Sequence, residues 1–158
     1  PDYTQAMLDA GIVCYRGNER SWMYQDVTGA QQPPHVRLGR LTDAYLNLSG
    51  DNLIAWDEVT EPSGLCNIPS SRFLRPHLPK LKHLESLRLK RVLEAMRKAA
   101  QEKKILHLWT HAHNLGVNME TNLAFLRAIC GEFRRLQNQY GMRSLTMTEA
   151  AELAKVTA

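Results

Sequence analysis

The sequence has few cysteines and no long apolar segment, and both shortages restrict the class of protein it encodes. Its three cysteines are widely spaced and form no Cys-x-x-Cys pair, which argues against a zinc site or a disulfide framework and favours reduced thiols in the cytoplasm. No apolar run approaches the ~18 residues that a membrane-spanning helix needs. The chain also lacks an initiator methionine and a signal-like segment, so we expect a fragment or a processed product.

Two catalytic signatures are missing as well: no serine stands in a nucleophile-elbow pattern, and no glycine-rich phosphate loop is present. The 158 residues, 44% hydrophobic and 23% charged, suffice for one globular domain with a core. The net charge is +4, and many basic residues lie between Lys80 and Lys104. No aromatic residues interleave with them and glutamates dilute them, so a solvated helix face is the favoured interpretation and nucleic-acid binding the weaker alternative.

Hydrophobic periodicity predicts an α/β order in which short strands precede helices. Such an order indicates a parallel sheet of three or four strands, too few for a closed barrel. We therefore expect a single domain that forms the C-terminal part of a larger α/β barrel. A capping box of Thr146 and Glu149 marks the start of the last helix. Helices are predicted over 3–10, 36–48, 79–102, 119–140 and 147–156, and strands over 12–15, 52–56, 64–69 and 105–109.

The run from Lys104 to Gly116 concentrates three histidines where an apolar strand enters a loop. Its composition is typical of a strand buried on both faces, with His107, Trp109 and His111 on one of them. A barrel or open α/β sheet keeps its chemistry at such strand ends. A single histidine on an apolar strand is, however, usually a hydrogen-bonded core residue. The pair His111 and His113 also suggests metal ligation, although no carboxylate or cysteine stands near enough in sequence to complete a ligand set.

A second polar loop, Arg16 to Arg20, follows the predicted strand over 12–15, and in a parallel sheet both loops lie at the same edge. A histidine there can act as a general acid or base near neutral pH, and an arginine can hold a carboxylate or stabilise developing negative charge. Trp22 and Trp56 are candidates for stacking against a sugar ring, with packing in a loop as the alternative. Trp22 is therefore a candidate substrate-binding residue. His113, in the loop that follows the histidine strand, is another.

Three motifs occur in an order that resembles one family. They are Gly11-Ile-Val-Cys-Tyr-Arg-Gly-Asn-Glu19, Gly64-Leu-Cys-Asn-Ile-Pro-Ser-Ser-Arg-Phe-Leu-Arg-Pro76 and His107-Leu-Trp-Thr-His-Ala-His-Asn114, with Ser144-Leu-Thr-Met-Thr-Glu149 behind them. Over nearly its whole length the chain is similar to the C-terminal half of polysaccharide deacetylases with the NodB homology domain, carbohydrate esterase family 4. The histidine motif is the most specific part of the match.

The resemblance implies a distorted (β/α) barrel that hydrolyses N-acetyl or O-acetyl groups of a glycan with a divalent metal such as zinc or cobalt. By position in the motifs, Arg16 matches the arginine that orients the catalytic base. His111 matches the general acid that protonates the leaving amine, and Trp109 would line the pocket for the acetyl methyl group. These roles are expectations from the resemblance.

Two departures from the family pattern qualify the resemblance. Ala112 stands where many relatives have proline, and neither an Asp-Asp strand nor a His-x-x-x-His pair precedes Arg16. The metal ligands and the base would therefore come from a separate N-terminal half, and the chain alone is expected to be inactive. Open sheet edges in a half barrel favour self-association into a homo-oligomer. The alternative is a non-catalytic carbohydrate-binding or structural remnant.

Overall fold

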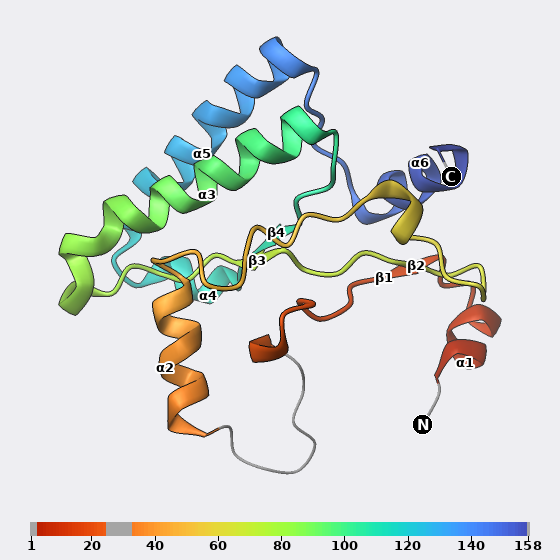
Figure 1. Ribbon diagram of the computed structural model, residues 1–158, viewed down its shortest axis with the longest axis horizontal. Helices are drawn as coiled ribbons and strands as arrows, with labels where there is room; N and C mark the ends of the chain where they lie inside the picture. Colours follow the sequence, from red (N-terminus) through yellow and green to blue (C-terminus); the bar gives the residue numbers. More distant parts are fainter. Residues whose placement is uncertain (1–2, 25–32, 158) are drawn as a thin grey trace.

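A computed structural model describes residues 3–24 and 33–157. Helices make up much of this structure, and short strands run through its middle (Figure 1). The α-helices are α1 (Thr4–Asp9), α2 (Pro34–Asp43), α3 (Glu85–Glu102), α4 (Ala112–Gly116), α5 (Met119–Tyr140) and α6 (Met147–Thr157). Short 3-10 turns lie at η1 (Trp22–Tyr24), η2 (Trp56–Glu58) and η3 (Pro79–Leu84).

The strands form two parallel ladders along one extended segment of the chain. β1 (Cys14–Tyr15) pairs with β2 (Cys66–Asn67), and β3 (Arg72–Phe73) pairs with β4 (Leu108–Trp109). Between β2 and β3 the same segment changes partner, because the Ser70 amide donates to Gly17 O and the Ser71 amide donates to His107 O. The described residues thus hold two short ladders in place of one sheet of three or four strands. They form no closed barrel.

The strand predicted over 105–109 is shorter than expected. Only Leu108 and Trp109 pair with β3, whereas Ile105 makes an isolated antiparallel bridge with Ile54. Residues 105–110 are all half-buried, so the prediction of burial on both faces is wrong. The reason is that a groove lies open beside this segment, and that β4 has one ladder partner among the described residues.

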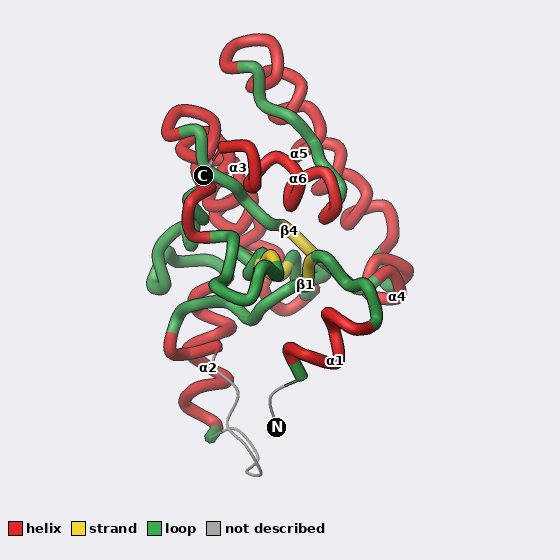
Figure 2. The backbone as a smooth tube through the Cα atoms, turned by 90° about the vertical axis from the view of Figure 1, so that its right-hand side faces the viewer, coloured by secondary structure: helices red, strands yellow, loops and turns green. Residues whose placement is uncertain are grey.

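The strands lie between two groups of helices. α3, α5 and α6 lie on one side, and α1 and α2 project from the other, as the two perpendicular views show (Figures 1 and 2). One core joins α6 to β2 and η2 around Val59, Cys66 and Ala154, and a second joins α3 and α5 around Val92, Met96 and Leu136. No described helix is long and apolar enough to cross a membrane.

The later helices follow the sequence closely. α5 has the predicted bounds, and α6 begins at Met147 behind the predicted capping box, in which the Glu149 carboxylate accepts from the Thr146 amide at 2.7 Å. α2 ends at Asp43, earlier than predicted. The Asp43 carboxylate accepts hydrogen bonds from the Leu48 and Ser49 amides, and such side-chain bonds to the backbone turn the chain out of a helix.

The buried face of α3 differs from the predicted one. Leu84, just before α3, and Leu87 are 37% and 40% exposed, although their 3–4 spacing with the later apolar residues predicts that they share the apolar face. Arg88 and Arg91, assigned to a solvated basic face, are 3% and 4% exposed. The assignment is wrong for these two arginines because each has buried partners. Arg88 lies 3.9 Å from the centroid of the Phe125 ring, and Arg91 pairs with an aspartate of α2.

Candidate functional site

The two polar loops singled out in the sequence meet in the structure. Arg16 follows β1, and Trp109 ends β4. The Arg16 guanidinium carbon lies 4.0 Å from the centroid of the Trp109 ring. Such a cation–π contact contributes about 0.5–1 kcal/mol at an exposed site, and Arg16 is exposed. The contact therefore places the arginine loop and the histidine loop at one position without locking them together.

Four aromatic rings continue from this contact in a row. Phe73 packs on Trp109 with centroids 4.6 Å apart, and His111 meets Trp109 edge-on at 5.1 Å. His113 stacks on His111 at 5.2 Å with an interplanar angle of 16°. His111 has extended backbone dihedrals and lies immediately before α4, so the start of this helix turns both imidazoles back to the end of β4. Both histidines are exposed and can exchange protons with a ligand.

The remaining predicted aromatic and histidine residues lie apart from this row. Trp22 is 70% exposed in η1, and no ring contact joins it to the row among the described residues. Trp56 donates from Nε1 to Lys103 O at 3.0 Å, which supports its interpretation as loop packing. His107 lies with Nδ1 3.1 Å from Ile68 O, and its amide donates to Ser71 Oγ. The predicted hydrogen bond of His107 is present, but the residue is half-buried and lines the groove beside β4, so its assignment to the core is wrong.

The described residues offer no ready metal site. Within 3–24 and 33–157, no three His, Cys, Asp or Glu side chains gather in an arrangement that could hold an ion. His111 and His113 stack face to face and have no third ligand beside them in this part of the chain. The residues described here therefore do not fit the divalent metal that the resemblance implies.

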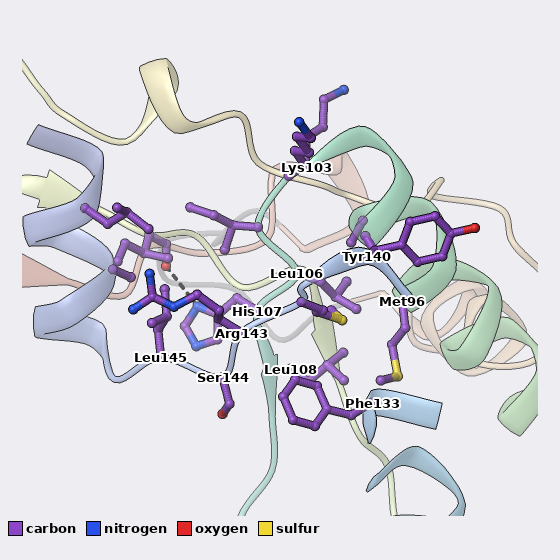
Figure 3. Close-up of a pocket in the computed structure, with 18 of the residues that line it drawn as sticks. Met96, Lys103, Leu106, His107, Leu108, Phe133, Tyr140, Arg143, Ser144 and Leu145 are labelled. Atoms are coloured by element: carbon purple, nitrogen blue, oxygen red, sulfur yellow. Dashed lines mark hydrogen bonds between the residues drawn. The ribbon is translucent and has the colours of Figure 1, made fainter. Parts of the chain in front are cut away.

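An apolar groove of about 670 Å³ lies beside β4, and Figure 3 shows its lining. Leu106, His107 and Leu108 form one side, with Met96 of α3 and Phe133 of α5 among the residues around them. The lining includes neither Arg16 nor any of the four rings, Phe73, Trp109, His111 and His113. The groove is therefore separate from the candidate site.

Comparison with family models, curated proteins and solved structures gives no match. The site is consequently interpreted from its own geometry and from the motifs in the sequence.

Sequence reasoning missed a buried ionic network that joins α2, β3 and α3. Asp43 is 0% exposed, and its Oδ1 accepts from Arg91 at 3.0 Å while its Oδ2 accepts from the hydroxyls of Tyr24 and Ser49 at 2.9 Å. Arg72 of β3 lies 3.9 Å from the same carboxylate. Burial acts to raise the pKa of Asp43, but the hydrogen bonds of Ser49 and the charge of Arg91 more than offset it, and the pKa is lowered.

A second carboxyl group, that of Glu19, completes the network from the loop that carries Arg16. Glu19 is 5% exposed, and its Oε1 accepts from Asn52 Nδ2 at 2.6 Å. Burial raises the pKa of Glu19 to about 7. The charge of the nearby Arg72 guanidinium acts to lower this pKa but offsets only part of the effect of burial. Strongly perturbed carboxyl groups of this kind cluster at functional sites.

One signal for the network was present in the sequence. Arg88 and Arg91 continue the 3–4 spacing of Val92, Ala95 and Met96 toward the start of α3, so the buried stripe runs through the arginines and not through the leucines. A pattern that counts only apolar residues cannot register this stripe. The acidic partners Asp43 and Glu19 carry no comparable signal, because they come from a helix end and a loop far away in sequence.

Proposed function

We propose that this chain forms the proton-donating side of a glycan deacetylase site, in a barrel of the NodB type that another segment completes. The observation that carries the proposal is the 4.0 Å contact between Arg16 and Trp109, with His111 edge-on to the same tryptophan. Residues from two distant motifs of the resemblance thus lie together at the ends of parallel strands. The strands belong to two separate ladders, and the carboxyl ends of parallel strands are where α/β proteins bind their substrates.

In the proposed reaction, water adds to the carbonyl carbon of an N-acetyl group and the carbon–nitrogen bond breaks. His111 gives its proton to the departing nitrogen, so that acetate and a free amine on the glycan are the products. Arg16 orients the catalytic base, which the completing segment supplies, and Trp109 packs against the acetyl methyl group. Exposed Trp22 and His113 bind flanking parts of the glycan.

The resemblance implies a divalent metal in the complete site, where such an ion polarises the acetyl carbonyl group. Its ligands would belong to the completing segment, since the described residues hold no ligand set. The roles proposed for Arg16, Trp109 and His111 are those of this chain's own side chains.

The experiment uses the protein expressed from its full coding sequence and an N-acetylated chito-oligosaccharide as substrate. His111→Ala is expected to lower kcat by about 10²–10⁴-fold, the usual contribution of a general acid, with the metal content unchanged. His113→Ala is the matched control, because it removes the stacked imidazole, and it is expected to raise KM more than it lowers kcat.

Loss of metal from His111→Ala, with turnover per bound metal retained, would contradict the role of His111. Binding of the oligosaccharide by wild-type protein without release of acetate would replace the proposal with a carbohydrate-binding function.

A further inference from the structure

The loop of residues 16–20 has one end in the candidate site and the other in the buried network. Its first residue, Arg16, lies over Trp109, and Glu19 is buried against Asn52. Between them, Gly17 O accepts from the Ser70 amide at 3.0 Å, which ties the loop to the segment between β2 and β3. The position of the Glu19 side chain therefore affects the position of Arg16 through the loop of residues 16–20.

β3 connects the network to the site a second time. Arg72 lies in the network, where it is 6% exposed and donates from NH2 to Gly50 O at 2.9 Å. The next residue, Phe73, packs on Trp109 at 4.6 Å. Both partners of the contact between Arg16 and Trp109 are thus linked to the pair of Glu19 and Arg72, one through the loop and one through the strand.

We propose that Glu19 is the positioning residue of Arg16: its neutral carboxyl group seats the loop of residues 16–20, and its ionisation releases Arg16 from Trp109. The groups that face Glu19 come from every element around it. They are Asn52, Asp43 at the end of α2, Arg72 of β3, Arg91 of α3 and the Tyr24 phenol of η1. The inference rests on the proposed function only for the catalytic meaning of Arg16.

The direction of the switch follows from the burial of Glu19. A seated carboxyl group with a pKa of about 7 binds its proton more tightly than a released one with the ordinary value of 4.5. A rise in pH through this range therefore favours the released loop. The ratio of seated to released loop falls by up to about 300-fold. Asp43 does not take part in the same way, because its pKa is lowered and it stays ionised throughout.

The test follows two nuclear magnetic resonance signals of the full chain between pH 5 and pH 9. The Arg16 side-chain protons report the contact through the ring current of Trp109, and the protection of the Ser70 amide from hydrogen exchange reports the seating of Gly17. All variants carry His111→Gln, which removes the imidazole that lies edge-on to Trp109. In this background the ring-current shift and the Ser70 protection, corrected for intrinsic exchange, are expected to fall together as the pH rises.

Glu19→Gln is expected to keep both signals at their low-pH values up to pH 9, because glutamine stays neutral. The matched control is Glu58→Gln, which alters an exposed carboxylate that binds Arg20 of the same loop at 2.6 Å. The control is expected to retain the pH dependence of the background protein. If Glu19→Gln does not fold, the carbon resonance of the Glu19 carboxyl group in the background protein must titrate with the same midpoint as the Arg16 shift.

Three results would overturn the inference. They are an unchanged pH profile in Glu19→Gln, pH-independent signals in the background protein, and an Arg16 shift that varies while Ser70 protection stays constant. None of these measurements needs turnover. Absence of deacetylation with a normal Arg16 switch would refute the proposed function and leave the inference standing.

Discussion

Replacement of Asp43 by alanine is expected to destabilise the fold more than any surface change. The carboxylate is fully buried and accepts hydrogen bonds from the Leu48 and Ser49 amides, from two hydroxyls and from Arg91. Asp43→Ala would leave Arg91 and Arg72 buried without their shared anion. Arg72 Nε and Arg91 NH1 already lack a hydrogen-bond partner among the described residues, so the loss of Asp43 would add to an existing shortage of acceptors.

The magnitude follows from these contacts. Removal of one partner from a buried ion pair lowers the free energy of unfolding by about 3–5 kcal/mol, and each buried amide left unpaired lowers it by a further ~1–3 kcal/mol. Because such effects are not additive, we expect a loss of at least about 4 kcal/mol. With a urea dependence of about 2 kcal/mol per molar, the unfolding midpoint would fall by about 2 M, or the variant would not fold.

The assay is equilibrium urea unfolding, followed by circular dichroism. Asp51→Ala is the matched control, since the half-buried Asp51 carboxylate binds the exposed Lys98 at 3.1 Å, and it is expected to cost about 1 kcal/mol. Asp43→Asn separates charge from hydrogen bonding and should fall between the two. A loss below 1 kcal/mol in Asp43→Ala would refute the argument that the network holds α2, β3 and α3 together.

Three further predictions concern the loop and the last helix. The free energy of unfolding of wild-type protein should fall by about 3 kcal/mol relative to Glu19→Gln as the pH rises from 4.5 through 7. The reason is that the raised pKa of Glu19 favours the folded state only while the carboxyl group is protonated. Parallel pH profiles of the two proteins in urea titrations would contradict this. Gly17→Ala should lower stability by about 1 kcal/mol, because a Cβ atom would overlap Asn67 Oδ1 and displace the amide that donates to Glu61, and an unchanged thermal midpoint would refute the close approach. Glu149→Ala should cost about 1 kcal/mol through loss of its hydrogen bonds to Thr146, and calorimetry that finds no change would show that the cap contributes nothing.

The sequence predicts well where local signals agree. α5 and α6 match their predicted ranges because a sustained 3–4 spacing and a capping box act within a single element. The meeting of Arg16 with Trp109 was expected from loops at one sheet edge. In the structure β1 and β4 belong to separate ladders, and a side-chain contact, not a shared sheet, brings the two residues together.

Long-range polar contacts explain what the sequence does not predict. α2 ends early because Asp43 turns its carboxylate to the following amides, and Arg91 is buried because that carboxylate faces it across the fold. Burial of Glu19 depends on Asn52, far along the chain. Periodicity within one element carries no information on such pairs. Strands of only two residues contain too little pattern to set their order in a sheet, so that order also depends on long-range hydrogen bonds.

The most direct test of the proposed function is acetate release from an N-acetylated chito-oligosaccharide by the protein expressed from its full coding sequence. The account predicts one acetate for each new free amine, at a rate that falls by orders of magnitude in both His111→Ala and Arg16→Ala while the oligosaccharide still binds. Acetate release at an unchanged rate in both variants would contradict it.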